Sequence, residues 1–237
     1  MPDSNWKITS RDGGTFDCHV ALPDTRQRVP AAVIASAIFG VDADIRQIAS
    51  EIASRGFIAA APNLFWRDGT GPLPMGDPRA APRGEPRLEK IRAGETDLAE
   101  VLASLRNQPL FNGRAAVIGF CYGGPYAILG PKRLGYDAGI SCHGTQMLDF
   151  VGELEGLAKP IGVLWGDQDV KAPAEVLDAY RAVASRMPNM ELHIFPGLLH
   201  GYAMRANTKA FDQSAFDFSM ARTVAMLAGL RQIPRDE

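Results

Sequence analysis

The chain has 237 residues, of which 46% are apolar, so it can bury a large core and is not intrinsically disordered. Its 25 basic and 27 acidic side chains nearly cancel to a formal charge of −2, which leaves no bulk field to attract nucleic acid or a membrane surface. No apolar run approaches the roughly 18 residues of a membrane span. The first residues lack the basic block and the apolar block that are typical of an export signal. We expect one cytoplasmic, monomeric domain over residues 1–237, whose partner is a small molecule.

The first elements in chain order form an expected hairpin. Two β-type runs, Trp6–Thr9 and Phe16–Ala21, flank the turn signal Asp12-Gly13-Gly14. We expect them to pair as antiparallel strands at the start of a sheet.

The pattern then changes to short apolar runs that alternate with stretches of helical period. Such runs are typical of strands that are covered on both faces, and the alternation predicts a doubly wound, mostly parallel α/β sheet with helices on both sides. The expected strands are Ala31–Phe39, Phe57–Ala61, Ala115–Phe120, Ala138–Cys142, Ile161–Trp165 and Leu192–Phe195. The expected helices are Asp44–Ser54, Leu88–Leu105, Pro125–Arg133, Leu148–Leu157, Ala174–Met187 and Asp212–Leu230.

Residues 66–87 form the one long stretch without a regular pattern. Its 22 residues contain five Pro and four Gly, which is too long for a simple connection. We expect a lid or a pocket wall here. In sheets of this kind the catalytic and binding residues follow the carboxyl ends of the strands, so we expect the functional site at that edge.

The strongest chemical signal is a nucleophile elbow that carries sulfur. The strand Ala115–Phe120 runs into Gly119-Phe120-Cys121-Tyr122-Gly123-Gly124 and then into a helix. The turn is so tight that the positions two before and two after the nucleophile must be nearly free of side chain, which explains Gly119 and Gly123. The helix amino end favours a thiolate on Cys121. The other two cysteines, Cys18 and Cys142, complete an odd and widely spaced set, which fits neither a disulfide framework nor a zinc site.

A thiol nucleophile usually needs a histidine, and the histidine needs a carboxylate to orient it. The order nucleophile, acid, histidine is met by Cys121, the turn Gly166-Asp167-Gln168-Asp169 and His200, each just past a strand. We prefer Asp169 to Asp167 because it lies further into the turn and is free to reach His200, whereas Asp167 is placed to bracket the turn.

The other histidines are weaker candidates. His19 lies in the hairpin and His193 within a strand, so we expect both to be structural. His143 ends a strand, where it could line the pocket or be held in a hydrogen-bonded structural role.

These motifs resemble the dienelactone hydrolase family of α/β-hydrolases. The similarity rests on Ile38-Phe39-Gly40, the elbow at Cys121, the turn with Asp169, and the segment from Gly197 to Gly201 with His200, and it covers nearly the whole chain. It implies an α/β-hydrolase fold and a triad of Cys121, His200 and Asp169. The implied enzyme hydrolyses an ester or enol-lactone without cofactor or metal. It also implies an oxyanion hole formed by the backbone N–H groups of Tyr122 and Ile38.

The sequence departs from the family pattern near the substrate. The family carries a glutamate just before Ile-Phe-Gly, and here that position is Ala37. It also carries an arginine four residues after the catalytic histidine, where this chain has Met204, with Arg205 one step later. Either the register slips by one residue or another group binds the substrate. The candidate substrate-binding residues are Arg79, Arg83 and Arg87 of the lid, and Arg205, His143 and Tyr202.

Two alternatives of another class stay open. The absence of a carboxylate at position 37 would fit a binding protein that has lost catalysis. A thiol-redox role would need Cys121 to pair with Cys142, which also ends a strand, although nothing in the sequence places the two sulfurs at bonding distance.

Overall fold

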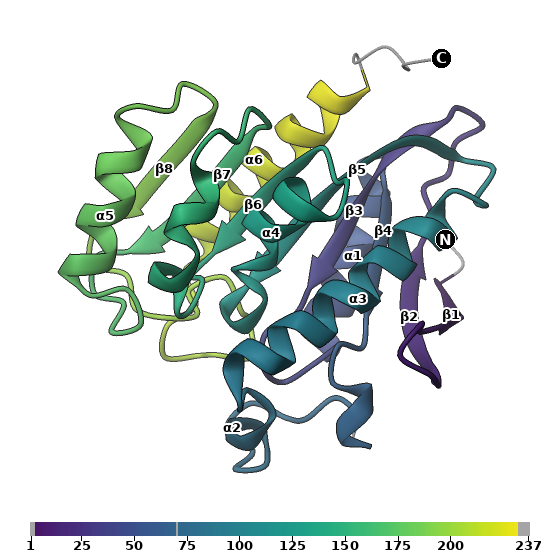
Figure 1. Ribbon diagram of the computed structural model, residues 1–237, viewed down its shortest axis with the longest axis horizontal. Coiled ribbons are helices and arrows are strands. Elements are labelled where there is room, and N and C mark those ends of the chain that lie inside the picture. Colours follow the sequence, from purple (N-terminus) through teal and green to yellow (C-terminus); the bar gives the residue numbers. More distant parts are fainter. Residues whose placement is uncertain (1–2, 70, 232–237) are drawn as a thin grey trace.

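The computed structural model describes residues 3–69 and 71–231. They contain an eight-stranded sheet of order β1-β2-β4-β3-β5-β6-β7-β8 (Figure 1). The expected hairpin is confirmed: β1 (Asp3–Thr9) pairs antiparallel with β2 (Thr15–Ala21), and β2 pairs antiparallel with β4 (Ile58–Pro62). The other strands are parallel, as expected: β3 (Val29–Ala35), β5 (Phe111–Phe120), β6 (Ala138–Cys142), β7 (Ile161–Gly166) and β8 (Met190–Phe195).

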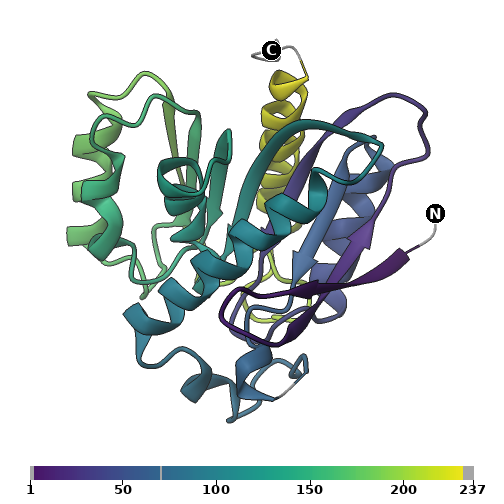
Figure 2. The ribbon, with the colours of Figure 1, turned by 45° about the vertical axis from the view of Figure 1, so that its right-hand side comes forward.

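Helices cover both faces of the sheet (Figures 1 and 2). One face carries α1 (Ala43–Ser54) and α6 (Gln213–Leu230). The opposite face carries α3 (Arg87–Leu105), α4 (Tyr126–Arg133) and α5 (Ala174–Ala184). Strand β3 shows why the sheet needs two covers, because Ala32 and Ile34 pack into the first core while Ala31, Val33 and Ala35 pack into the second. This is the period of two that a strand buried on both faces imposes.

Two expected elements differ from those in the structure. Strand β3 ends at Ala35, not at Phe39, because Ala35 pairs with Gly119, only two residues before its neighbour β5 turns into the elbow. Residues 36–39 therefore form a loop at the carboxyl edge of the sheet. The expected helix Leu148–Leu157 is instead a 3₁₀ helix, η3 (Met147–Leu154), which begins after the left-handed residue Gln146 and ends before Gly156, whose φ is 67°.

The expected lid is irregular over most of its length. It contains the 3₁₀ turn η1 (Trp66–Asp68) and the short helix α2 (Ala80–Arg83), and it ends where α3 begins at Arg87. Its backbone is joined to the loop after β3 by a hydrogen bond from the Leu73 N–H to the Phe39 carbonyl at 2.8 Å. The lid therefore faces the carboxyl edge of the sheet, where the candidate site lies.

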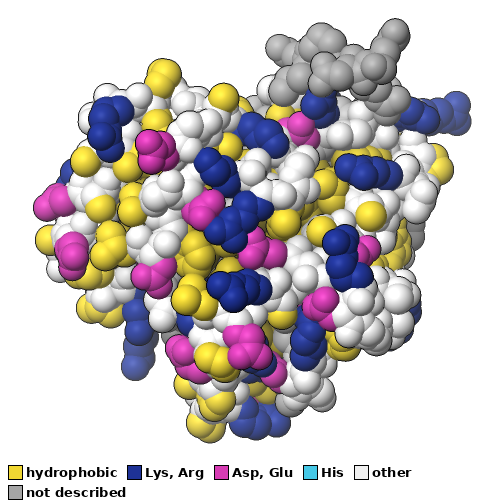
Figure 3. All heavy atoms as spheres, viewed as in Figure 1, with side chains coloured by type: hydrophobic (Ala, Val, Ile, Leu, Met, Phe, Trp, Pro, Cys, Tyr) yellow, Lys and Arg dark blue, Asp and Glu magenta, His cyan; other side chains and the backbone are white. Residues whose placement is uncertain are grey.

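The surface carries mixed charge. On the face shown in Figure 3, basic and acidic side chains are interspersed, and neither sign forms a continuous patch. Several of these charges pair across elements, such as Arg133 with Glu95 and with Glu153. No helix among the described residues is long and apolar enough to cross a membrane.

Candidate active site

The nucleophile elbow is built as its glycines require. Cys121 has a φ of 51°, in the left-handed backbone region that residues other than glycine rarely adopt. A Cβ on Gly119 would lie 2.2 Å from the Gly123 carbonyl oxygen, and a Cβ on Gly123 would lie 2.1 Å from the Ala35 carbonyl oxygen. Any larger residue would push the elbow off the sheet. The elbow thus fixes the position of the thiol at the end of β5.

The structure brings Cys121, His200 and Asp169 together from three loops. The Nε2 atom of His200 lies 3.2 Å from the Cys121 sulfur, and its Nδ1 lies 2.9 Å and 3.0 Å from the two carboxylate oxygens of Asp169. Asp169 is only 2% exposed, and its Oδ1 also accepts the Lys171 N–H at 2.8 Å. The carboxylate is thereby aimed at the imidazole by its own turn.

Asp167, the alternative acid, lies elsewhere. Its Oδ1 accepts the backbone N–H of Gly197 at 2.7 Å and so brackets the turn before His200. The side chain is exposed to solvent. Between the two candidate acids, the geometry joins Asp169 to the imidazole.

The surroundings favour a charged His200. Burial alone would lower its pKa, but the hydrogen bonds to Asp169 and Cys121 outweigh burial and raise the pKa from 6.5 to about 10. The neighbouring His143 behaves in the opposite way. Burial and the nearby His200 lower the pKa of His143 well below 6.5, so this imidazole is neutral at pH 7. The two rings meet edge to face, with centroids 5.2 Å apart.

A cavity of about 570 Å³ opens above the triad, a size typical of small-molecule sites. It is lined by Cys121, His143 and His200 and by both residues of the expected oxyanion hole, Ile38 and Tyr122. Three non-glycine residues among the described ones have a positive φ, namely Cys121, His143 and Gln146, and all three line this cavity. Backbone strain of this kind concentrates at functional sites.

The expected substrate-binding arginines do not present free guanidinium groups to the cavity. Arg79 is an exposed partner of Asp77, and Arg205 pairs with Glu51 at 2.7 Å and stacks on Phe216. Arg83 donates to the Ile38 and Gly71 carbonyls. None of these three arginines is among the lining residues.

Tyr202 and His143 take different positions. Tyr202 is fully buried, and its hydroxyl lies 3.1 Å from the Ser219 hydroxyl, away from the cavity. His143 lines the cavity, but its ring is fully buried and packs edge to face against Tyr202 with centroids 5.3 Å apart. Neither ring nitrogen of His143 has a hydrogen-bond partner within residues 3–69 and 71–231.

Arg87 lines the cavity and ties its walls together. Arg87 is only 7% exposed, and the central carbon of its guanidinium lies 3.9 Å from the centroid of the Tyr122 ring. Its Nη2 donates to the Tyr122 carbonyl at 3.0 Å and to the Thr145 carbonyl at 3.3 Å, while the Thr145 N–H donates to the Cys121 carbonyl at 3.0 Å. Arg87 thus joins the elbow to the loop after β6. The sequence offered Arg87 only as one more lid arginine, and nothing in the sequence signalled these carbonyl partners.

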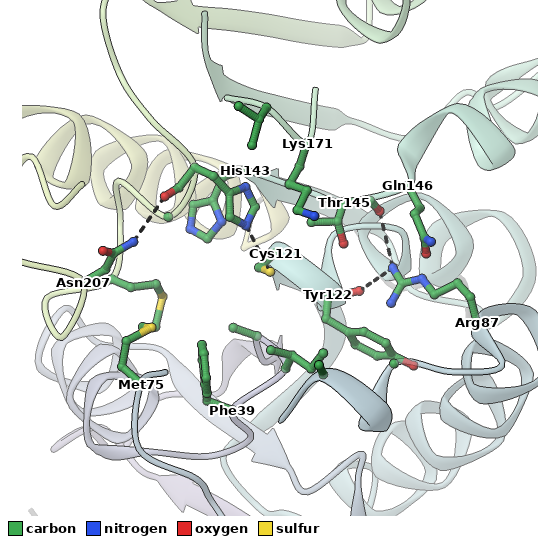
Figure 4. Close-up of a pocket in the computed structure, with 18 of the residues that line it drawn as sticks. Phe39, Met75, Arg87, Cys121, Tyr122, His143, Thr145, Gln146, Lys171 and Asn207 are labelled. Atoms are coloured by element: carbon green, nitrogen blue, oxygen red, sulfur yellow. Dashed lines mark hydrogen bonds between the residues drawn. The ribbon is translucent and has the colours of Figure 1, made fainter. Parts of the chain in front are cut away.

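Other lining residues gave no signal in the sequence. Figure 4 shows Cys121 near the middle of the cavity, with Phe39 and Met75 on one side and Arg87, Thr145 and Gln146 on the other. Lys171 could have been noticed, because it follows Asp169 by two residues in the same turn.

Among residues 3–69 and 71–231, no cluster of His, Cys, Asp and Glu side chains could hold a metal ion.

The sheet, the strained elbow at the end of β5 and the three converging side chains define an α/β-hydrolase. The model of the dienelactone hydrolase family matches residues 16–230, and the chain belongs to that family. It is a hydrolase of the ester and lactone class.

Named relatives agree with this placement. The chain is similar to carboxymethylenebutenolidase 1 of Cupriavidus pinatubonensis, with 31% identity over 95% of this chain and 96% of the relative. It is also similar to a carboxymethylenebutenolidase of Pseudomonas sp. strain P51, with 30% identity over 95% of each chain. Among solved structures, a Klebsiella pneumoniae protein assigned as a dienelactone hydrolase has the same fold, with a TM-score of 0.80 and 19% identity over 96% of this chain and 98% of that protein.

Proposed function

We propose that this protein hydrolyses small carboxylic esters or enol-lactones through a triad of Cys121, His200 and Asp169. The observation that carries the proposal is the continuous line of contacts from the Cys121 sulfur through the His200 ring to the Asp169 carboxylate. A nucleophile that touches its base, with the base held by a buried acid, is the arrangement that acyl transfer requires.

The reaction runs in two halves. In the first, the Cys121 thiolate attacks the substrate carbonyl, and the backbone N–H groups of Tyr122 and Ile38 stabilise the resulting oxyanion. The protonated His200 then gives its proton to the leaving alcohol, and a thioester remains on Cys121. In the second half, neutral His200 takes a proton from water, the water oxygen attacks the thioester, and the acid is released with the thiolate restored.

The proposal accounts for the missing carboxylate at position 37. Ala37 lines the cavity beside the elbow and can hold no proton. The thiol therefore depends on His200, which is already within 3.2 Å and whose pKa is raised to about 10. The base therefore already contacts the nucleophile before substrate binds.

The same geometry disfavours the redox alternative. Cys142 is only 1% exposed and packs in the core between the sheet and α6, and burial raises the pKa of its thiol to about 12. All three cysteines are free thiols. A resolving cysteine would need a reachable thiolate, which this environment opposes.

The test is steady-state hydrolysis of phenyl acetate by the wild type, Cys121→Ala and Cys142→Ala. We expect Cys121→Ala to lose about 10⁴-fold or more in kcat, because no other group supplies the nucleophile. Cys142→Ala removes a thiol of the same type from the core and should stay within a few-fold of the wild type. Equal activity of Cys121→Ala and the wild type would refute the proposed function.

A further inference from the structure

The two ends of the catalytic cavity differ in chemistry. Beyond Cys121 on the Phe39 and Met75 side (Figure 4), most lining side chains are apolar, and the polar one there, Asn207, donates its amide to the His200 carbonyl. The apolar ones come from three separate segments, namely the loop after β3, the lid and the segment after His200: Ile38, Phe39, Met75, Ala81 and Met204. We call this group the apolar end.

Among the residues that the structure describes, no cationic side chain lines the apolar end to pair with an anion. Met204 is 2% exposed and packs in the same core cluster as Met75. The adjacent Arg205 points away, with its guanidinium on Glu51 and over the Phe216 ring. A carboxylate placed here would lose its hydration without gaining a partner, which is costly.

Apart from His200 of the triad, the charged lining residues lie at the other end or at the rim. The Arg87 guanidinium is occupied by the Tyr122 and Thr145 carbonyls. Glu85 and Lys171 are exposed and carry opposite charges. Solvated charges of opposite sign give little net attraction to an anion.

We propose that the apolar end receives the acyl chain and selects chains that are uncharged and apolar over chains that carry a carboxylate. The inference rests on the proposed function and names the substrate class of that same site. The specificity-determining residues are Met75 and Met204, which line the end where an anion would need a cation.

The test compares two phenyl esters of equal shape. Phenyl 6-methylheptanoate and monophenyl adipate have the same chain length and end in an isopropyl group and a carboxylate, respectively. We expect the wild type to hydrolyse the uncharged ester with a kcat/KM at least tenfold higher. A ratio of one or below, with phenyl acetate still hydrolysed, would overturn the inference and leave the proposed function intact.

Two variants make the test reciprocal. Met204→Arg should raise kcat/KM for the adipate ester and lower the ratio at least tenfold, whereas Met204→Leu should keep the wild-type preference. Because Met204 is buried, Met75→Lys on the partly exposed lid provides the same change of charge where folding is less at risk. If Met204→Arg and Met75→Lys both fold and keep the wild-type ratio of kcat/KM between the two esters, the role of the apolar end is contradicted. Loss of phenyl acetate hydrolysis in Cys121→Ala, tested alongside, separates this outcome from a failure of the proposed function.

Discussion

The two walls of the cavity are built in different ways. The wall with Cys121, His200 and Asp169 stands on strand ends, and each residue is fixed locally, by the elbow glycines, by the Asn207 amide on the His200 carbonyl, and by the Asp169 turn. The opposite wall consists of lid and loop side chains that meet through apolar contact, such as Met75 against the core that contains Met204. We therefore infer that short local motifs set the chemistry, while side chains gathered from distant segments set the choice of substrate.

The largest effect within the triad wall after loss of the thiol should come from Asp169→Asn. The change removes the negative charge that orients His200 and raises the pKa of its ring, and we expect kcat to fall by about 10² to 10⁴-fold. Rates should fall by the same factor for charged and uncharged esters, because this wall does not choose the substrate. Stopped-flow or steady-state assays with both esters measure this.

Asp167→Asn is the matched control for that change. Asp167 accepts the Gly197 N–H and the Gln168 side-chain amide, and the amide oxygen of asparagine can still accept the bond from Gly197. We expect activity within a few-fold of the wild type. Equal losses in the two variants would break the assignment of the acid.

The meeting of the Cys121, Asp169 and His200 side chains could be expected from the sequence because its information is local. Glycines at fixed offsets, a strand before each loop and the chain order were enough to point to Cys121, Asp169 and His200. The fold followed in the same way from the period of apolar residues. The end of β3 was placed four residues too late, because Ser36 to Phe39 look like a continuation of the strand until the pairing with β5 is known.

The substrate wall could not be predicted in this way. Whether an arginine faces a cavity depends on which partner captures its guanidinium, and those partners are far away in sequence. Glu51 holds Arg205 across 154 positions, and the Tyr122 and Thr145 carbonyls hold Arg87 across 35 and 58. No local pattern encodes such partners.

Substitution of Arg87 tests whether the elbow depends on its tie to the loop after β6. We expect Arg87→Met to lower kcat about tenfold with little change in KM, because the Tyr122 and Thr145 carbonyls lose a charged donor and the elbow loses its support. Partial recovery in Arg87→Lys would mark a positioning role rather than simple packing.

Arg133→Met is the control for the loss of a paired arginine. Arg133 pairs with Glu95 and Glu153 on the surface, away from the cavity. Its replacement should leave kcat unchanged. A kcat for Arg87→Met equal to that of Arg133→Met would show that the elbow does not need the hydrogen bonds from Arg87 to the Tyr122 and Thr145 carbonyls.

The smallest expected effect is on stability as a function of pH. The pKa of His200 is raised from 6.5 to about 10 in the folded chain, so the protonated ring stabilises the fold fully below pH 6.5, and this contribution is lost as the pH rises towards 10. Between pH 7 and pH 10 we expect the Tm of the wild type to fall about 3 °C more than that of Asp169→Asn, which corresponds to roughly 1 kcal/mol. Tm is measured by thermal denaturation at each pH. If the Tm of the wild type and of Asp169→Asn fell equally between pH 7 and pH 10, a charged His200 in the resting state would be contradicted.

The most direct test of the central claim is to trap the acyl group on the protein. Wild-type protein mixed with phenyl acetate for milliseconds and quenched in acid should carry one acetyl group, and peptide mapping should place it on Cys121. The adduct should be absent in Cys121→Ala and should persist longer in His200→Ala, if that variant is acylated by a large excess of ester. Rapid hydrolysis by the wild type without any acetyl on Cys121, or with the acetyl on another residue, would contradict the account.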